Sequence, residues 1–280
     1  MKKLLKINEV VKKYNLSAKK SLGQNYIFDL NLTEKIVLAS GSIKNYNVLE
    51  IGSGPGSLTR SILESGAKNV LVIEIDERFL SPLNEIKEHY PDKLNIIIDD
   101  YFNVKISNYL SPPIKVISNL PYNRSVEMLD TLLLTEEWPP FWDNLTLMFQ
   151  KEVADRILAK ENNKNYGRLS ILSNWRTTPK KLFNIDPLSF KPHPKVKSSL
   201  LNFKPKDNFL NVTDKKNFFK LIKIVFNQRR KMIRKTLKPL VKDIDEILNK
   251  CGIKPTDRAE NISIEKFCKL SNLIDEFNSS

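Results

Sequence analysis

The stretch NVLEIGSGPG, residues 47–56, decides the fold of this chain. Its first five residues form a short, mostly apolar run, which is typical of a buried parallel strand, and three glycines follow directly. Residues 57–65 then show the apolar spacing of a helix. A glycine turn between a strand and a helix lets the backbone approach a ligand where a Cβ atom would collide. The stretch therefore predicts a nucleotide-type binding turn in a Rossmann-like α/β fold.

A second apolar run, NVLVIEI at residues 69–75, has an acidic residue, Glu74, just before its last position. Glu74 lies 22 positions after Gly52. In nucleotide-binding folds an acidic residue about 20 positions after the glycine turn binds the hydroxyls of a ribose. Glu74 is therefore a candidate ribose ligand.

Glu50, just before the glycine turn, bears on which nucleotide binds there. A carboxylate beside the pocket disfavours the pyrophosphate of a dinucleotide and favours a cation. S-adenosylmethionine carries a sulfonium, an ammonium and a ribose, and it has no phosphate. We therefore predict S-adenosylmethionine as the cofactor, in preference to NAD.

The tetrapeptide Asn119-Leu120-Pro121-Tyr122 follows another apolar run, residues 114–118. It brings together an amide side chain, a backbone carbonyl without a helical partner and an aromatic face. These groups suit a site that holds the exocyclic amino group of a nucleobase. Asn and Pro are also common in ordinary turns, so the prediction depends on the glycine turn upstream.

The order of apolar runs predicts a mostly parallel sheet with helices on both faces. The expected strands are 47–51, 69–75, 94–98, 114–118 and 144–149, separated by helices near 56–65, 77–90 and 124–134, with two late strands at 180–185 and 198–204. Ligands of such sheets bind beyond the carboxyl ends of the strands. Gly52, Glu74, Asp100 and Asn119 all lie at the carboxyl ends of strands, so we expect them at one rim of the sheet.

The chain is expected to have two domains, a methyltransferase domain at residues 1–206 and a small all-α basic domain at residues 207–280. The helices expected in the second domain cover 214–237, 240–250 and 263–276. The formal net charge of +14 and the pI near 9.5 favour a polyanionic partner. From Lys215 to Lys242 there are eleven Lys or Arg residues and no Asp or Glu. We expect RNA contacts here from Arg229, Arg230, Lys231, Arg234 and Lys235, although a merely basic surface helix is the alternative.

Other chemistries find little support in the sequence. Only two cysteines and two histidines are present, without the spacing of a zinc site and without a nucleophile turn of the G-x-S-x-G type. The expected protein holds no metal. Free thiols, the absence of a long apolar run and an N-terminus without the features of a signal peptide favour a cytoplasmic location and no membrane partner.

With these residues in view, the chain resembles the family of ribosomal RNA small-subunit adenine N6,N6-dimethyltransferases, which have a class I methyltransferase fold. The matching segments are KSLGQNY (20–26), LEIGSGPGSLT (49–59), VIEID (72–76), NLPYN (119–123), QKEVADR (150–156), YGRLS (166–170), PKVKS (194–198) and NQRRK (227–231). Three positions depart from the usual pattern: Tyr26 replaces a Phe, Arg124 stands where an apolar residue is frequent, and Val104 lies where an acidic loop often ends.

The resemblance implies roles for named residues. Gln24, Asn25 and the glycine turn would hold the methionine end of the cofactor, Ile75 would pack on its adenine, and Asp100 would accept from its amino group. The full set expected to bind the cofactor is Gln24, Asn25, Ile27, Glu50, Gly52, Gly54, Gly56, Glu74, Ile75, Asp100, Tyr101 and Asn119. The pocket for the target adenine would comprise Asn119, Leu120, Pro121, Tyr122 and Phe190.

The implied reaction dimethylates N6 of two adjacent adenines in the 3′-terminal hairpin of 16S rRNA. The implied partner is the small ribosomal subunit, and a monomeric protein is expected. Two other functions stay open: methylation of 23S rRNA adenine, as in antibiotic resistance, and a non-enzymatic role as an RNA-binding assembly factor. A nicotinamide oxidoreductase is disfavoured because no proton-transfer residue accompanies the site.

Overall fold

The computed structural model describes residues 4–239, 241 and 243–279, and Lys242 of the basic segment lies outside them. These residues divide into two compact units. The first contains the chain up to Ala154 together with Lys180–Pro205, and the second contains Asp155–Pro179 together with the chain from Lys206 onward. The sequence-based division assigned residues 155–179 to the first domain. They belong to the second unit because Trp175 packs with Phe218 in its core, at 5.0 Å between ring centroids.

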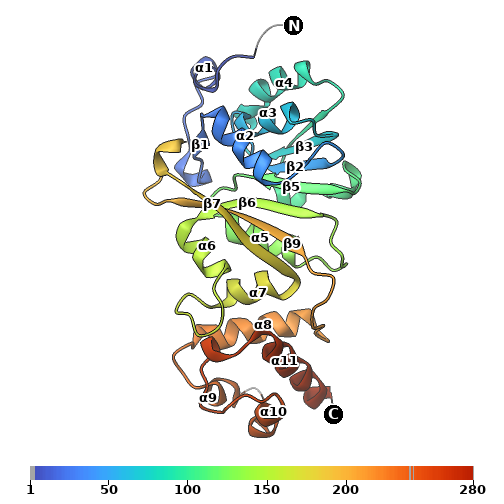
Figure 1. The fold of residues 1–280 in the computed structure, drawn as a ribbon, viewed down its shortest axis with the longest axis vertical. Helices are drawn as coiled ribbons and strands as arrows, with labels where there is room; N and C mark the ends of the chain where they lie inside the picture. Colours follow the sequence, from blue (N-terminus) through green and yellow to red (C-terminus); the bar gives the residue numbers. More distant parts are fainter. Residues whose placement is uncertain (1–3, 240, 242, 280) are drawn as a thin grey trace. The chain divides into compact units, whose positions relative to one another are not determined.

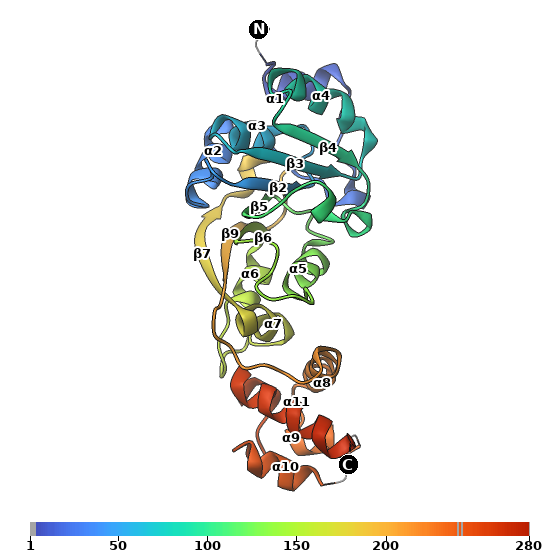
Figure 2. The same cartoon turned by 90° about the vertical axis from the view of Figure 1, so that its right-hand side faces the viewer.

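A seven-stranded sheet forms the centre of the first unit. Its strands, in spatial order, are β4 (Leu94–Ile98), β3 (Asn69–Glu74), β2 (Asn47–Ile51), β5 (Ile114–Ser118), β6 (Asn144–Gln150), β9 (Ser198–Pro205) and β7 (Thr177–Ile185). The order from β4 to β6 runs from top to bottom in Figure 2. The five strands from β4 to β6 are parallel, and β9 pairs antiparallel with β6. The predicted mostly parallel α/β sheet is thus confirmed.

Every residue of β2 and β5 is buried, which requires cover on both faces of the sheet. The helical elements of the first unit are α1 (Ile7–Lys13), η1 (Lys20–Leu22), α2 (Leu30–Ala39), α3 (Ser57–Glu64), η2 (Glu77–Phe79), α4 (Leu80–His89), η3 (Tyr101–Asn103), η4 (Ile106–Asn108), α5 (Ser125–Leu133) and η5 (Pro187–Ser189). Helix α6 (Lys151–Ile157) begins in the first unit and ends in the second. Helices α2 and α3 pack against each other (Figure 1), and the Thr33 and Ser61 hydroxyls join them at 2.7 Å. The strands predicted at 47–51, 94–98 and 114–118 match the observed bounds.

A small two-stranded sheet joins distant parts of the first unit. Strand β1 (Tyr26–Ile27) pairs antiparallel with β8 (Phe190–Lys191), and Ile27 lies opposite Phe190. Both of these side chains are buried in the main hydrophobic core. The pairing fixes the segment before α2 to the connection between β7 and β9.

The second unit is a helical bundle around its own apolar core. Its elements are α7 (Arg168–Arg176), α8 (Lys215–Asn227), α9 (Ile233–Leu237), α10 (Ile244–Lys250), η6 (Ala259–Asn261) and α11 (Ile264–Ser279). The single helix predicted over 214–237 is wrong, because it is interrupted between Asn227 and Ile233. Met232 forms a β-bridge with Arg258, and the Ile233 N–H donates to the Asp257 carbonyl at 2.7 Å. Within the described part of the chain, no helix has the length and apolarity to span a membrane.

Gly56 tests how tightly the first unit specifies its glycine turn. It caps α3 with φ of 86°, and an added Cβ would collide with Ile86 of α4. We expect Gly56→Ala to lower the free energy of unfolding by roughly 1–3 kcal/mol, because a non-glycine residue is strained there. The measurement is equilibrium urea unfolding. Gly167→Ala is the control, since Gly167 has extended backbone and room for a Cβ. Equal stability of the Gly56 variant and the parent would contradict this account.

Candidate active site

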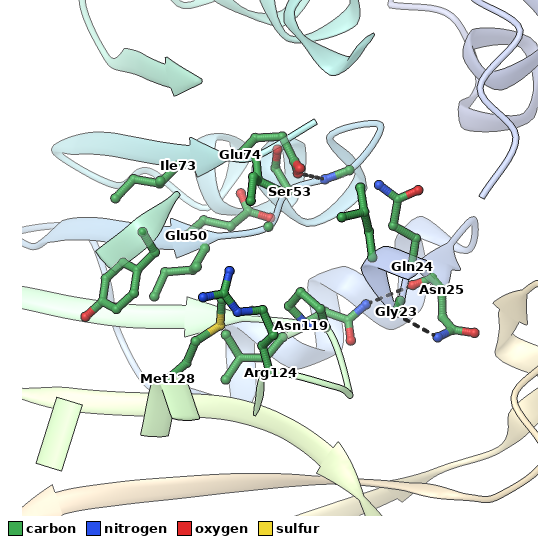
Figure 3. A pocket seen from close by; sticks show the side chains of 18 of the residues that line it. Gly23, Gln24, Asn25, Glu50, Ser53, Ile73, Glu74, Asn119, Arg124 and Met128 are labelled. Carbon is green, nitrogen blue, oxygen red and sulfur yellow. Dashed lines mark hydrogen bonds between the residues drawn. The ribbon is translucent and has the colours of Figure 1, made fainter. Parts of the chain in front are cut away.

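A cavity opens at the carboxyl ends of β2, β3 and β5, and Figure 3 shows the side chains around it. The predicted residues that line it are Gln24, Asn25, Ile27, Glu50, Gly52, Gly54, Glu74, Ile75, Asp100, Tyr101, Asn119, Leu120, Pro121 and Tyr122. They come together because parallel strands place all their carboxyl ends at one rim. The sequence-based site is therefore one continuous surface within the first unit.

The Glu74 carboxylate holds the glycine turn in place. It is 4% exposed, and its two oxygens accept from the Gly54 N–H at 2.9 Å and from the Asp76 N–H at 3.0 Å. Gly54 has φ of 55°, and a Cβ there would lie 3.2 Å from the Tyr26 ring. Burial raises the pKa of Glu74 above its ordinary value, although the bonds from Asp76 and Gly54 act in the opposite direction. The turn thus needs glycine both for its conformation and for its close packing.

Glu50 is the most deeply buried acid of the cavity wall. It is 1% exposed and accepts a hydrogen bond from the Thr59 hydroxyl at 2.6 Å. Burial raises the pKa of Glu50 to about 8; the Thr59 bond lowers this pKa and the nearby Glu74 raises it further. A cation bound in the cavity would stabilise the ionised form of Glu50, which otherwise is costly at this site.

The Gln24 amide is occupied by bonds within the protein. Its oxygen accepts from the Tyr26 hydroxyl at 2.7 Å and from the Lys19 N–H at 2.9 Å, and its nitrogen donates to Asp76 at 3.0 Å. The buried Asp76 carboxylate also pairs with Arg78 at 2.6 Å. The bonds from Arg78 and Gln24 hold the pKa of Asp76 well below its usual range, against the effect of burial. Asp76 therefore anchors the segment before β1 to the end of β3.

The turn after β5 is bonded to the same segment by two side-chain amides. Asn119 Nδ2 donates to the Asn25 carbonyl at 3.1 Å, and Asn123 Nδ2 donates to the Ser21 carbonyl at 3.1 Å. Because the Asn119 nitrogen is used in this way, its oxygen is the group available to a ligand in the cavity (Figure 3). The Tyr122 hydroxyl lies 2.5 Å from the Ser198 hydroxyl, which fixes the aromatic ring.

Arg124 is a cavity residue that the sequence flagged only as a departure from the family pattern. It pairs with Asp100 at 2.7 Å and with Glu127 at 3.3 Å, and its guanidinium lies 4.6 Å from the Phe102 ring centroid. Burial raises the pKa of Asp100, but the bonds from Arg124 and the Phe102 N–H outweigh it and lower this pKa. The sequence shows that position 124 is an arginine, but only the folded structure shows that it pairs with Asp100. Asp100, the expected acceptor for the cofactor adenine, is thus shared with Arg124.

Two predicted site residues lie outside the cavity lining. Phe190 is fully buried in the main core, opposite Ile27, and does not line the cavity, so the expectation that it faces the target pocket stays a prediction. An aromatic residue suits both a hydrophobic core and a base-binding site, and the β1–β8 pairing explains why Phe190 packs in the core. Gly56 packs against α4 and serves the turn's conformation.

The basic residues predicted to bind RNA lie in the second unit. Arg229 pairs with Glu260 at 2.5 Å, and Arg234 pairs with Asp245 at 2.6 Å. Arg230, Lys231 and Lys235 are exposed. Exposed cations are the more accessible to phosphates, because the paired arginines would first have to exchange partners.

The raised pKa of Glu50 predicts a pH dependence of stability. A carboxyl whose pKa is higher in the folded state than in the unfolded state stabilises the fold while protonated, and this stabilisation is lost as the pH rises toward 8. In the ligand-free protein we expect the free energy of unfolding to fall between pH 5 and 8, by up to about 1.4 kcal/mol per pH unit from this group. Urea unfolding at several pH values measures the slope.

The variant Glu50→Gln should lose this component of the slope and gain stability relative to the parent as the pH rises. Glu88→Gln, which changes an exposed carboxylate of α4, is the matched control and should keep the parent's slope. Parallel curves for the parent and the Glu50 variant would refute the assignment of this titration to Glu50.

Comparison with known proteins agrees with the geometry. A profile of the ribosomal RNA adenine dimethylase family matches residues 15–276. Proteins called ribosomal RNA small subunit methyltransferase A are similar, with 47% identity over 265 residues for Cereibacter sphaeroides (95% of each chain) and 45% over 268 residues for Rhizobium johnstonii (95% of this chain, 96% of the relative).

Two solved structures are similar over most of the chain. A dimethyladenosine transferase from Plasmodium falciparum has a TM-score of 0.72 and 26% identity, covering 90% of this chain and 97% of that one. The 23S rRNA methyltransferase ErmE has a TM-score of 0.64 and 21% identity, covering 90% and 100%. At that identity the likeness to ErmE shows the fold alone. The family resemblance found in the sequence is confirmed, and the chain belongs to the ribosomal RNA adenine dimethylase family.

Proposed function

We propose that this protein transfers methyl groups from S-adenosylmethionine to N6 of two adjacent adenines in the 3′-terminal hairpin of 16S rRNA. The observation that carries the proposal is the single cavity in which the glycine turn and Asn119-Leu120-Pro121-Tyr122 face one another. The names of the curated relatives support the small subunit as the source of the substrate. Methylation by a purified protein of isolated small subunits, with the product nucleoside identified, tests it.

The lining of the cavity fits S-adenosylmethionine better than a phosphate-bearing nucleotide. Glu50 and Glu74 are buried acids next to the glycine turn, and they disfavour an anion there. Glu74 would accept from the ribose hydroxyls, Ile75 and Tyr101 would pack around the adenine, and the segment containing Gln24 and Asn25 would enclose the methionine end. When bound, S-adenosylmethionine supplies an electrophilic methyl group on its sulfonium. The protein's own residues must bind and orient the two reactants.

For the target base, the protein's task is orientation. The Asn119 oxygen and the Leu120 carbonyl would accept the two N6 hydrogens of an adenine that has left its stack, and Tyr122 would support the ring. Accepting both hydrogens directs the nitrogen lone pair toward the methyl donor. Placing two reactants in this way lowers a barrier by ~7–11 kcal/mol, so no titratable catalyst is required. The proton is lost from nitrogen after it has been alkylated.

Phe190 lies outside the cavity lining, and its contact with the target adenine stays a prediction. With Phe190 in the core, Tyr122 is the one aromatic residue of the predicted pair that lines the cavity among the described residues. The adenine would therefore be held on one face by Tyr122, while its edge is held by Asn119 and Leu120.

Methylation of 23S rRNA is the alternative that shares this chemistry. The likeness to ErmE extends to the fold, and the closer identity to small-subunit methyltransferases favours 16S rRNA. Parallel assays on isolated small and large subunits separate the two. A role in subunit assembly without catalysis would appear as retained subunit binding by a variant without methyl transfer. RNA binding by the basic helices, a cytoplasmic location and a monomeric state stay predictions.

Asn119→Ala tests the orientation role. We expect kcat for methyl transfer to fall by roughly 10²–10³, as on removal of one positioning hydrogen-bond group at a reaction centre, while cofactor affinity changes little. Asn123→Ala is a matched control, because Asn123 makes an equivalent bond from the same turn to the Ser21 carbonyl. It should lose far less activity. Equal losses in both variants would mean that Asn119 acts only by bracing the turn.

Glu74→Gln tests the ribose assignment. The amide keeps the shape of the carboxylate but has only one acceptor oxygen, so it can keep only one of the bonds from the Gly54 and Asp76 N–H groups and is a weaker acceptor for a ribose. We expect the Kd for S-adenosylmethionine to rise about 10- to 100-fold, which corresponds to a loss of about 1.5–3 kcal/mol. Isothermal titration calorimetry measures the change, with thermal unfolding as a check that the turn remains folded. An unchanged Kd would remove Glu74 from the ribose site.

A further inference from the structure

The segment DPLSFKPHPKVK, residues 186–197, forms an exposed loop between β7 and β9 in the first unit, here called the 186–197 loop. It carries three exposed lysines, Lys191, Lys195 and Lys197. Its one acid, Asp186, is used to cap η5 by accepting from the Leu188 N–H at 3.0 Å. The outer surface of the loop is therefore positively charged.

The same loop exposes apolar side chains beside its lysines. Leu188 is 75% exposed and Val196 is 44% exposed. Surface side chains of this size that stay in water beside cations suit a ligand with both charged and flat apolar parts. A nucleic-acid strand has phosphates for the lysines and ribose or base surfaces for the apolar groups.

One side of the loop is attached to residues that line the part of the cavity expected to hold the cofactor. Within β8, Lys191 lies opposite Tyr26 and Phe190 lies opposite Ile27 of β1. Tyr26 and Ile27 line the cavity. The buried Phe190 ring acts as an anchor for this attachment, because it is fully enclosed in the core.

The other side of the loop is attached near the part of the cavity expected to hold the target adenine. The Lys197 carbonyl accepts from the Lys151 N–H at 2.8 Å, and the next residue, Ser198, contacts the Tyr122 hydroxyl at 2.5 Å. The Tyr122 side chain, which is expected to support the adenine, is thus bonded to Ser198, the residue that directly follows the loop. A strand held by the loop would lie next to the mouth of the target pocket.

We infer that the 186–197 loop holds the RNA backbone beside the target adenine. The inference rests on the proposed function. An adenine that leaves its stack stays in the pocket only if the phosphates on either side of it are restrained, and the lysines of the loop provide positive charge at that place. This surface is separate from the basic residues of the second unit, which were the RNA-binding residues expected from the sequence.

The test is a triple variant, Lys191→Gln, Lys195→Gln and Lys197→Gln. Its matched control is Lys44→Gln, Lys68→Gln and Lys93→Gln, which removes the same charge from three exposed lysines that precede β2, β3 and β4. Those positions lie at the amino ends of the strands, the rim opposite the cavity. Binding to the 3′-terminal hairpin RNA of 16S rRNA is measured over a range of salt concentrations, and methyl transfer to small subunits is measured separately.

For the loop variant we expect weaker RNA binding, a log–log salt slope smaller by about 2 if all three lysines contact phosphates (~0.7 per lost contact), and a higher KM for subunits. Affinity for S-adenosylmethionine and the thermal midpoint should match the parent. A third variant, Arg230→Gln, Lys231→Gln and Lys235→Gln, compares the second unit. At saturating RNA, the methyl-transfer rate of this second-unit variant should return to the parent's rate. The rate of the loop variant should stay below the parent's rate.

An unchanged salt slope and KM in the loop variant would overturn the inference, as would an equal loss in the control variant, which would reveal a general charge effect. Failure of the parent protein to methylate either ribosomal subunit would instead overturn the proposed function. The binding slopes decide the role of the loop in either case, because they do not depend on methyl transfer.

Discussion

The bond between the Glu74 carboxylate and the Gly54 N–H is the interaction on which the cavity depends. A carboxylate that is 4% exposed needs hydrogen bonds to offset its lost hydration, and the backbone of the glycine turn provides one. In return the turn is fixed in a conformation with positive φ at Gly52 and Gly54. The same pair of oxygens also receives the Asp76 N–H, so the ends of β2 and β3 form one unit. A ribose would meet a carboxylate that is already oriented.

The opposite wall of the cavity is assembled from bonds across long stretches of sequence. The segment from Lys19 to Tyr26 is fixed by Asp76 through Gln24, and by Asn119 and Asn123 through backbone carbonyls. Strand β8 adds a further attachment at β1. Because these contacts reach both the cofactor side and the target side, the segment links the two halves of the site. A ligand that brings positive charge would offset the cost of ionising the buried Glu50.

The 186–197 loop extends this linkage to the surface. It is bonded to β1 on one side, and on the other the adjoining Ser198 contacts Tyr122, so both ends of the loop adjoin residues that line the cavity. Phe190, which by family pattern would face the base, instead provides the buried anchor that holds the loop. Phe190, an aromatic residue expected to contact the adenine, thus packs in the core and anchors the 186–197 loop.

Local pattern in the sequence determined the parallel sheet, the glycine turn and the rim at which the cavity opens, because strand periodicity and the conformational freedom of glycine are properties of a few adjacent residues. It also predicted Glu74 and Asn119 as site residues, since each lies at the carboxyl end of a strand. Only the tertiary structure decided the ion pair of Arg124 with Asp100, the burial of Phe190, the break after Asn227 and the membership of residues 155–179 in the second unit. Each of these four features depends on which residues, distant in sequence, pack against one another. Residue spacing within a single helix or strand does not specify such contacts.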